Sequence, residues 1–138
     1  MQTSRQGFRK PGYAGLRGEL RSVSMVRTKR VYDPTSEEDG FRILVDGMWP
    51  RGLTREKANI EVWLREIAPS AEIRKWFGHD PVRWSEFKRK YFEELERNVS
   101  AVTELRSYTD VQDVTLVYSA KDRDYNNAVC LAEYLATR

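Results

Sequence analysis

The sequence has very few of the residues on which much protein chemistry depends. It has one cysteine, Cys130, and one histidine, His79, among 138 residues. A single cysteine excludes an internal disulfide and a cysteine-based zinc site, and a single histidine excludes a histidine pair for a metal. Cys130 lies in an apolar helical pattern, which is typical of an inert buried thiol. We therefore predict no metal, no cofactor and a reducing, cytoplasmic setting.

Long apolar runs and nucleotide-binding fingerprints are missing as well. No stretch approaches the roughly 20 apolar residues that a membrane span requires, so we predict no membrane partner. Neither of the glycine-rich phosphate-binding fingerprints occurs. Hydrophobic residues make up 40% of the chain and charged residues 33%, which is typical of a globular domain and excludes a fully disordered chain.

The net charge of +3 is unevenly distributed along the chain. Residues 1–24 contain five Lys or Arg and one Asp or Glu. Residues 25–138 contain 19 Lys or Arg and 20 Asp or Glu. The N-terminal segment has little apolar surface with which to offset its ordering entropy. We predict a flexible basic extension at 1–24 and a single domain at 25–138. Two hypotheses for the extension stay open: an alternative-start segment, or an arm that contacts the phosphates of nucleic acid.

Three apolar runs predict the strands of a sheet. They lie at Val26–Tyr32, Phe41–Asp46 and Val114–Tyr118. Eight turn-forming residues, 33–40, separate the first two runs. So short an interval favours an antiparallel pair over a parallel crossover, unless the interval contains a short helical turn.

Helical patterns fill the interval between the second and third runs. Helices are predicted to start at Thr54, Ser70 and Asp80, whose side chains can cap a first turn. Residues 62–67 predict a short amphipathic helical piece, and residues 125–136 a closing helix. The predicted fold class is α/β, with a small, mainly parallel or mixed sheet of three to four strands. A long helical excursion separates the second and third strands.

The second apolar run ends in polar residues that are candidates for a site. Asp46 follows the run directly, where a carboxylate is costly unless it is solvated, hydrogen-bonded or paired. Asp46 and Arg51 either line a ligand crevice, with Arg51 binding an anion, or form a structural pair that holds the turn. Trp49 is either a stacking surface for a ligand or a lid over the core.

Two further candidates lie in the helical excursion. His79 is the only residue that can supply an imidazole general base, although a histidine in a capping loop has no such task. Trp76, three residues earlier, is a candidate flat wall for a ligand.

The third apolar run is followed by a dense polar segment. A phenol, a hydroxyl, an ammonium and a carboxylate occur within five residues, as Tyr118, Ser119, Lys121 and Asp122. Asn126 and Asn127 then lie in the first turn of the closing helix, where free amides favour anions. Such a strand–loop–helix suits a phosphate or ribose. Ligand binding, catalysis and plain helix capping stay open as roles.

The carboxyl ends of strands in an α/β sheet commonly form one crevice, so we expect Asp46, Arg51 and Lys121 to line a single cleft. Tyr118 or Trp49 is expected in its wall. The leading prediction is a pocket for a small anionic, phosphorylated or nucleotide-like ligand. A catalytic version would hydrolyse the ligand or cleave a glycosidic bond, with Asp46 assisting and Lys121 stabilising developing charge.

Two alternative functions remain. One is a nucleic-acid-associated protein that uses the basic extension, and the other is a non-catalytic interaction domain. The sequence makes no prediction of oligomeric state.

Several short runs occur in a specific order along the chain. They are Lys29–Pro34, Asp39–Asp46, Trp49–Gly52, Ala68–Ser70 and Tyr118–Lys121. With these runs, residues 27–135 resemble the domain of unknown function 488 family (DUF488), in its short YeaO-like branch. The family has no settled activity, so the resemblance implies the kind of domain and leaves the reaction open.

The chain departs from the family pattern at two positions. Relatives usually carry arginine in place of Gly47 and histidine in place of Asn127, so the resemblance implies the loss of one cation and one imidazole. The cysteines of longer members are also absent from the matching positions, which excludes thiol chemistry of that type. Both differences argue against catalysis.

Overall fold

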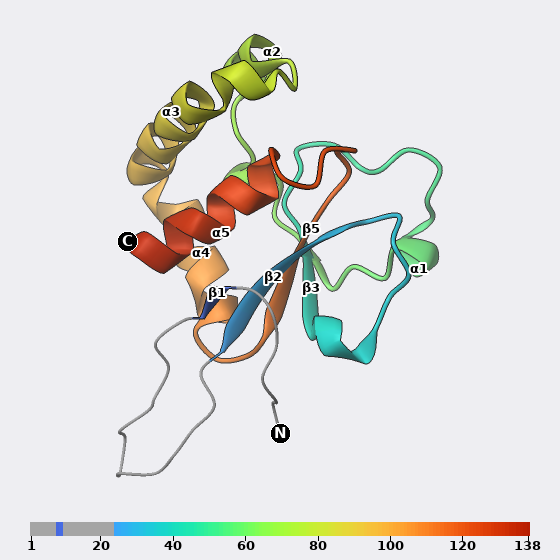
Figure 1. Cartoon of the computed structure of the whole chain (residues 1–138). Coiled ribbons are helices and arrows are strands. Elements are labelled where there is room, and N and C mark those ends of the chain that lie inside the picture. Colours follow the sequence, from blue (N-terminus) through green and yellow to red (C-terminus); the bar gives the residue numbers. More distant parts are fainter. Residues whose placement is uncertain (1–7, 10–23) are drawn as a thin grey trace, which may run out of the picture.

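The computed structural model describes residues 8–9 and 24–138. A five-stranded sheet in the order β1-β2-β5-β3-β4 forms the framework (Figure 1). The strands are Phe8–Arg9 (β1), Met25–Arg30 (β2), Phe41–Leu44 (β3), Val62–Trp63 (β4) and Val114–Tyr118 (β5). Strands β2, β5, β3 and β4 run parallel, and β1 pairs antiparallel with β2. The predicted α/β fold with a mainly parallel or mixed sheet is confirmed.

Strand β1 adds one strand beyond the predicted three to four. It lies inside the segment that the sequence predicts as a flexible basic extension. The rest of that segment, up to residue 23, lies outside the described residues.

The predicted antiparallel pairing of the first two apolar runs is wrong. Strand β5 lies between β2 and β3 and is parallel to both, with Val114 opposite Val26 on one side and Phe41 on the other. The connection of residues 31–40 is long enough for this return, because ten extended residues reach about 33 Å. A strand of six residues is only about 20 Å long, and two strand spacings add about 10 Å sideways.

Five α-helices complete the fold of the residues that the structure describes. They are Arg55–Ala58 (α1), Ala71–Phe77 (α2), Trp84–Arg97 (α3), Val99–Thr109 (α4) and Asn127–Thr137 (α5). Short 3₁₀ helices lie at Glu37–Asp39 (η2), Arg65–Ile67 (η3) and Pro81–Arg83 (η4). In Figure 1, α2 to α5 lie to one side of the sheet and α1 to the other. None of the helices in the described part of the chain is both long and apolar enough to span a membrane.

The predicted helix starts are confirmed by their caps. The Thr54 side chain accepts a hydrogen bond from the backbone N–H of Lys57, and that of Ser70 from Ile73. The Asp80 side chain accepts one from the N–H of Val82, at the start of η4 rather than of α3 itself.

The helical prediction for residues 62–67 is only partly right. Val62 and Trp63 form strand β4 beside Ile43 and Leu44, and a helical turn starts only at Arg65. The apolar residues of so short a segment do not distinguish a strand from a helix, and pairing with β3 decides between them.

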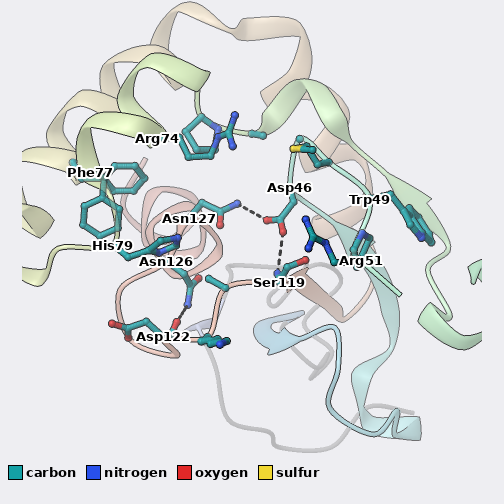
Figure 2. Close-up of a pocket in the computed structure, with 18 of the residues that line it drawn as sticks. Asp46, Trp49, Arg51, Arg74, Phe77, His79, Ser119, Asp122, Asn126 and Asn127 are labelled. Atoms are coloured by element: carbon teal, nitrogen blue, oxygen red, sulfur yellow. Dashed lines mark hydrogen bonds between the residues drawn. The ribbon is translucent and has the colours of Figure 1, made fainter. Parts of the chain in front are cut away.

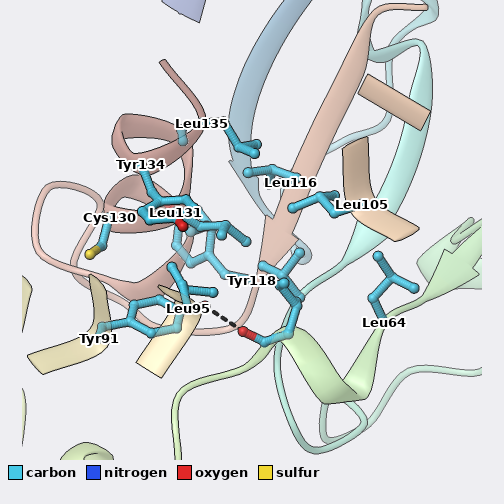
Figure 3. Close-up of a cluster of buried hydrophobic side chains, with 14 of the residues drawn as sticks. Leu64, Tyr91, Leu95, Leu105, Leu116, Tyr118, Cys130, Leu131, Tyr134 and Leu135 are labelled. Atoms are coloured by element: carbon cyan, nitrogen blue, oxygen red, sulfur yellow. Dashed lines mark hydrogen bonds between the residues drawn. The ribbon is translucent and has the colours of Figure 1, made fainter. Parts of the chain in front are cut away.

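The core has a part on each face of the sheet. Val114, Leu116 and Tyr118 face the larger cluster, whereas Val117 belongs to the smaller one. Figure 3 shows the larger cluster, in which α3, α4 and α5 pack on the sheet. Phe87, Tyr91 and Leu95 of α3 are buried there, and their spacing of four residues places them on one face of the helix. Cys130 is fully buried, and burial raises the pKa of its thiol.

A buried guanidinium fixes β3 against α1. Arg42 is 2% exposed and donates hydrogen bonds to Asp39 at 2.7 Å and to the carbonyl oxygens of Ala58 and Asn59, both at 2.8 Å. Lys29 donates a further bond to Asp39 at 2.8 Å. Because every polar group in the cluster has a partner, the buried charges are compensated. The residues after β3 therefore leave the sheet from a fixed position.

Candidate functional site

A cavity of about 750 Å³ opens at the carboxyl ends of β3 and β5. Its walls come from the loops after these two strands, the start of α5, and helices α2 and α3 (Figure 2). Its polar lining comprises Tyr32, Asp46, Arg51, Arg74, His79, Ser119, Lys121, Asp122, Asn126 and Asn127. The apolar part of the lining includes Trp49, Phe77 and Phe87. The structure thus brings Asp46, Arg51 and Lys121 to one cleft.

Asp46 is held in place by the segments around it. One carboxylate oxygen, Oδ2, accepts a hydrogen bond from the backbone N–H of Ser119 at 2.9 Å. The other, Oδ1, accepts one from the side-chain amide of Asn127 at 3.1 Å (Figure 2). The backbone carbonyl of Asp46 accepts a bond from the Trp63 indole at 2.8 Å. Asp46 therefore ties β3 to the loop after β5 and to α5.

Of the two hypotheses for Asp46 and Arg51, the structural pair is not formed. The bonding partners of the carboxylate are Ser119 and Asn127. Burial raises the pKa of Asp46, and this effect outweighs the hydrogen bonds from Asn127 and Ser119 and the charge of Arg74, which lower it. The ionised carboxylate is thus held at a cost, which is often found at functional sites.

Three cations line the pocket without a carboxylate partner. Within the part of the chain that the structure describes, Arg51, Arg74 and Lys121 have no Asp or Glu oxygen within salt-bridge distance. The two acids of the pocket, Asp46 and Asp122, accept hydrogen bonds from N–H groups of the protein. Asp122 accepts hydrogen bonds from the backbone N–H groups of residues 124 and 125 at 2.9 and 3.0 Å. The charge available to a ligand is therefore positive.

Trp49 is both a wall of the pocket and a lid over the smaller core cluster. Its indole N–H donates to the carbonyl oxygen of Leu53 at 2.7 Å, and its ring packs edge-on against Trp63. The guanidinium of Arg55 lies 5.3 Å from the ring centroid. Its structural role is thus shown, and stacking on a ligand stays a prediction.

Asn126 is a helix cap, one of the roles left open for it. It is 2% exposed, and its side-chain oxygen accepts the N–H of Val129 at 2.9 Å. Its amide nitrogen donates to the carbonyl oxygen of Asp122 at 2.9 Å. Asn127 also donates to the carbonyl of Val45 at 3.1 Å, so both asparagines shape the pocket through hydrogen bonds within the protein.

Two of the candidate residues lie outside the pocket lining. Trp76 instead contacts two cations, since the charged groups of Arg83 and Lys90 each lie 5.3 Å from its ring centroid. Tyr118 lies in the core and is 2% exposed. Sequence reasoning also missed Arg74 and Phe77, which belong to the lining. Their spacing of three residues was a usable signal, because it puts both side chains on one face of a helix.

The described residues offer no metal site. Within residues 8–9 and 24–138, no three His, Cys, Asp or Glu side chains gather closely enough to hold an ion. What the geometry supplies is cations, amides, one partly buried carboxylate and aromatic walls.

The match to a family model identifies the relationship of this chain to known proteins. Residues 25–138 match DUF488-N3i, described as the inactive DUF488-N3 subclade. The chain belongs to this family. The resemblance that the sequence motifs indicate is thus confirmed.

Bacterial relatives support the same conclusion. The uncharacterized protein YeaO of Escherichia coli K12 is 40% identical over 110 residues, which cover 80% of this chain and 96% of YeaO. The uncharacterized proteins Mb3100c of Mycobacterium bovis and Rv3073c of Mycobacterium tuberculosis are each 38% identical over 113 residues. Those alignments cover 82% of this chain and 95% of either relative. No solved structure matches the chain.

Proposed function

We propose that this DUF488 protein binds a small phosphorylated or nucleotide-like anion at the strand ends and does not convert it. The observation that carries the proposal is the charge balance of the pocket. Arg51, Arg74 and Lys121 have no carboxylate partner among the described residues, whereas Asp46 and Asp122 are engaged by donors of the protein. An anion entering the pocket gains charge-assisted hydrogen bonds and breaks no ion pair.

The size and walls of the pocket support a small organic anion. A volume of about 750 Å³ lies in the usual range for small-molecule sites, roughly 300–1,000 Å³. The apolar side chains of Trp49, Phe77 and Phe87 lie among the cations and amides. Such a lining suits a ligand with both a charged and an apolar part.

Hydrolysis assisted by Asp46 and Lys121 is the weaker form of the hypothesis. The raised pKa of Asp46 favours it, since it brings the carboxyl group closer to the pH at which an acid or base acts. Two observations argue against turnover. Both oxygens of Asp46 accept hydrogen bonds from within the protein, and the subclade is described as inactive. Binding without conversion is therefore the better-supported function.

The two alternative functions have less support. A nucleic-acid contact through the basic extension depends on residues 1–24, nearly all of which lie outside the described part of the chain. An interaction domain without a ligand leaves the shared pocket of Asp46, Arg51 and Lys121 without a purpose.

The experiment compares Arg51→Ala and Lys121→Ala with Arg89→Ala, a control that removes the same charge away from the pocket. Arg89 pairs with Glu86 and Glu93 on the surface of α3. The probes are inorganic phosphate and adenosine monophosphate (AMP). Thermal unfolding detects binding, because a ligand at 100 times its Kd adds about 2.7 kcal/mol of stability.

We expect at least one probe to stabilise the wild-type protein and AMP to be recovered unchanged. Each pocket variant should weaken binding about tenfold, the loss of one charge-assisted hydrogen bond worth about 1.5 kcal/mol. The free variants should unfold at nearly the wild-type temperature, since neither side chain has an ion-pair partner among residues 8–9 and 24–138. Absence of stabilisation by both probes, or an equal loss in Arg89→Ala, would overturn the proposal.

A further inference from the structure

A tight turn between α2 and η4 carries an unexpected residue. Helix α2 ends at Phe77, and only Gly78 and His79 precede the Asp80 cap of the next helical turn. The N–H of Asp80 donates to the carbonyl of Phe77 at 2.9 Å, which closes the turn. Both central residues have positive φ, 53° at Gly78 and 58° at His79. That pattern, typical of a type I′ turn, favours Gly, Asn or Asp at both positions.

Histidine at this position puts strain on the backbone. An L-residue in the left-handed region brings its Cβ too close to the following carbonyl oxygen, a cost that glycine avoids. The chain offers a matched comparison in Asn59, the other non-glycine residue with positive φ in the described part, at 54°. Asn59 ends α1 and lies outside the pocket lining. The two positions share their backbone strain and differ in their access to the pocket.

The imidazole of His79 does little for the fold. The side chain is exposed, and within the described residues neither ring nitrogen makes a hydrogen bond. Its nearest aromatic contact is a tilted one, with the ring centroids of His79 and Phe77 6.0 Å apart. His79 does line the pocket. The strained position thus presents the ring to a ligand without an evident gain in stability.

The pocket has two chemically different ends. Figure 2 shows Phe77 and His79 on one side of Asp46, and Arg51 and Trp49 on the other. Phe87 stacks on Phe77 with ring centroids 4.5 Å apart, and both rings are buried, at 2% and 4% exposed, so they form the floor of the aromatic end while His79 is its exposed side chain. Asp46 lies between the ends, and its two oxygens are oriented by the hydrogen bonds from Ser119 and Asn127.

We propose that His79 is a ligand-contacting residue that, with Phe77, holds a planar heterocycle, while Arg51 holds a phosphate at the other end. The ligand class is then a nucleoside monophosphate, with the sugar hydroxyls near Asp46. This inference rests on the proposed anion binding. It goes further in requiring an aromatic ring, which neither inorganic phosphate nor a sugar phosphate possesses.

The experiment measures calorimetric binding of AMP and of ribose 5-phosphate to the full chain, to His79→Gly and to Asn59→Gly. AMP should bind the wild-type chain at least tenfold more tightly than ribose 5-phosphate does. His79→Gly should weaken AMP about tenfold and leave ribose 5-phosphate unchanged, because only AMP carries a ring. Free His79→Gly should also unfold about 2–4 °C higher through relief of backbone strain. Asn59→Gly should leave both affinities unchanged.

The outcomes separate this inference from the proposed function. Equal binding of AMP and ribose 5-phosphate, with no effect of His79→Gly, would overturn the ring contact and leave anion binding in place. A similar loss of both ligands in His79→Gly would make His79 a phosphate contact, which also overturns the inference. If neither compound nor inorganic phosphate binds, the inference and the proposed function both fail.

Discussion

The hydrogen bond from Asn127 to Asp46 can be tested through Asn127→Ala. The substitution removes two bonds of 3.1 Å, one to the Asp46 carboxylate and one to the carbonyl oxygen of Val45. A hydrogen bond to a charged group contributes about 1.5–3 kcal/mol, and a neutral one about 0.5–1.5 kcal/mol. Both bonds are long and partly buried, so the lower ends apply. We expect a loss of about 2 kcal/mol in the free energy of unfolding at pH 7.

The loss should depend on pH, and the pKa of Asp46 gives its sign. Burial raises this pKa in the folded protein above the unfolded value, so stability falls as the pH rises through the folded pKa. The bond from Asn127 is the largest of the effects that lower the pKa. Removing this bond raises the folded pKa further, so the free energy of unfolding falls over a wider pH range. The difference in unfolding free energy between wild type and variant should therefore grow with pH. It should start from about 1 kcal/mol at low pH, where Asp46 is protonated in both proteins.

Urea unfolding across a pH series measures the gap, and carbon NMR of the Asp46 carboxyl group measures the pKa. Asn98→Ala is the matched control, because the Asn98 side-chain amide donates to the backbone carbonyl of Glu66 at 2.8 Å, which does not titrate. Its cost should not change with pH. The assigned hydrogen bond would be refuted if the stability loss of Asn127→Ala were also independent of pH, or if the pKa of Asp46 were the same in the variant and the wild type.

Two further predictions concern glycines and a helix cap. Gly40→Ala should destabilise by about 3 kcal/mol or more, since φ is +65° and a Cβ would lie 2.6 Å from a backbone oxygen. Gly47→Ala, whose Cβ would meet only a methyl carbon at 3.6 Å, should cost under about 1 kcal/mol by the same urea assay; equal costs would contradict the backbone geometry. Asp80→Ala should cost about 1 kcal/mol through loss of its cap, with AMP affinity unchanged. A stable Asp80→Ala protein that no longer binds AMP would show that the carboxylate acts in the site.

The sequence predicted the local features of this protein well. The caps at Thr54, Ser70 and Asp80 bond to backbone groups two or three residues away, so the information lies within one turn of chain. The buried strand at 114–118 follows from an apolar run that needs no partner to be recognised. The position of Asp46 after one strand and of Lys121 after another predicted the cleft that they line.

Tertiary structure alone decided the features that depend on distant segments. The insertion of β5 between β2 and β3 joins residues more than 70 positions apart, and the short loop 31–40 permits either pairing. The conformation of residues 62–63 depends on the edge of β3.

The site shows the same division. By itself the sequence determined the fold class, the helix starts and the two strand ends that supply Asp46 and Lys121. Only the folded chain decided that Asp46 bonds to Ser119 and Asn127, and that α2 turns Arg74 and Phe77 into the pocket. The physical reason is the separation along the chain over which each interaction acts. Caps and apolar periodicity act within a few residues, whereas strand order and helix docking depend on burial between segments that meet only after folding.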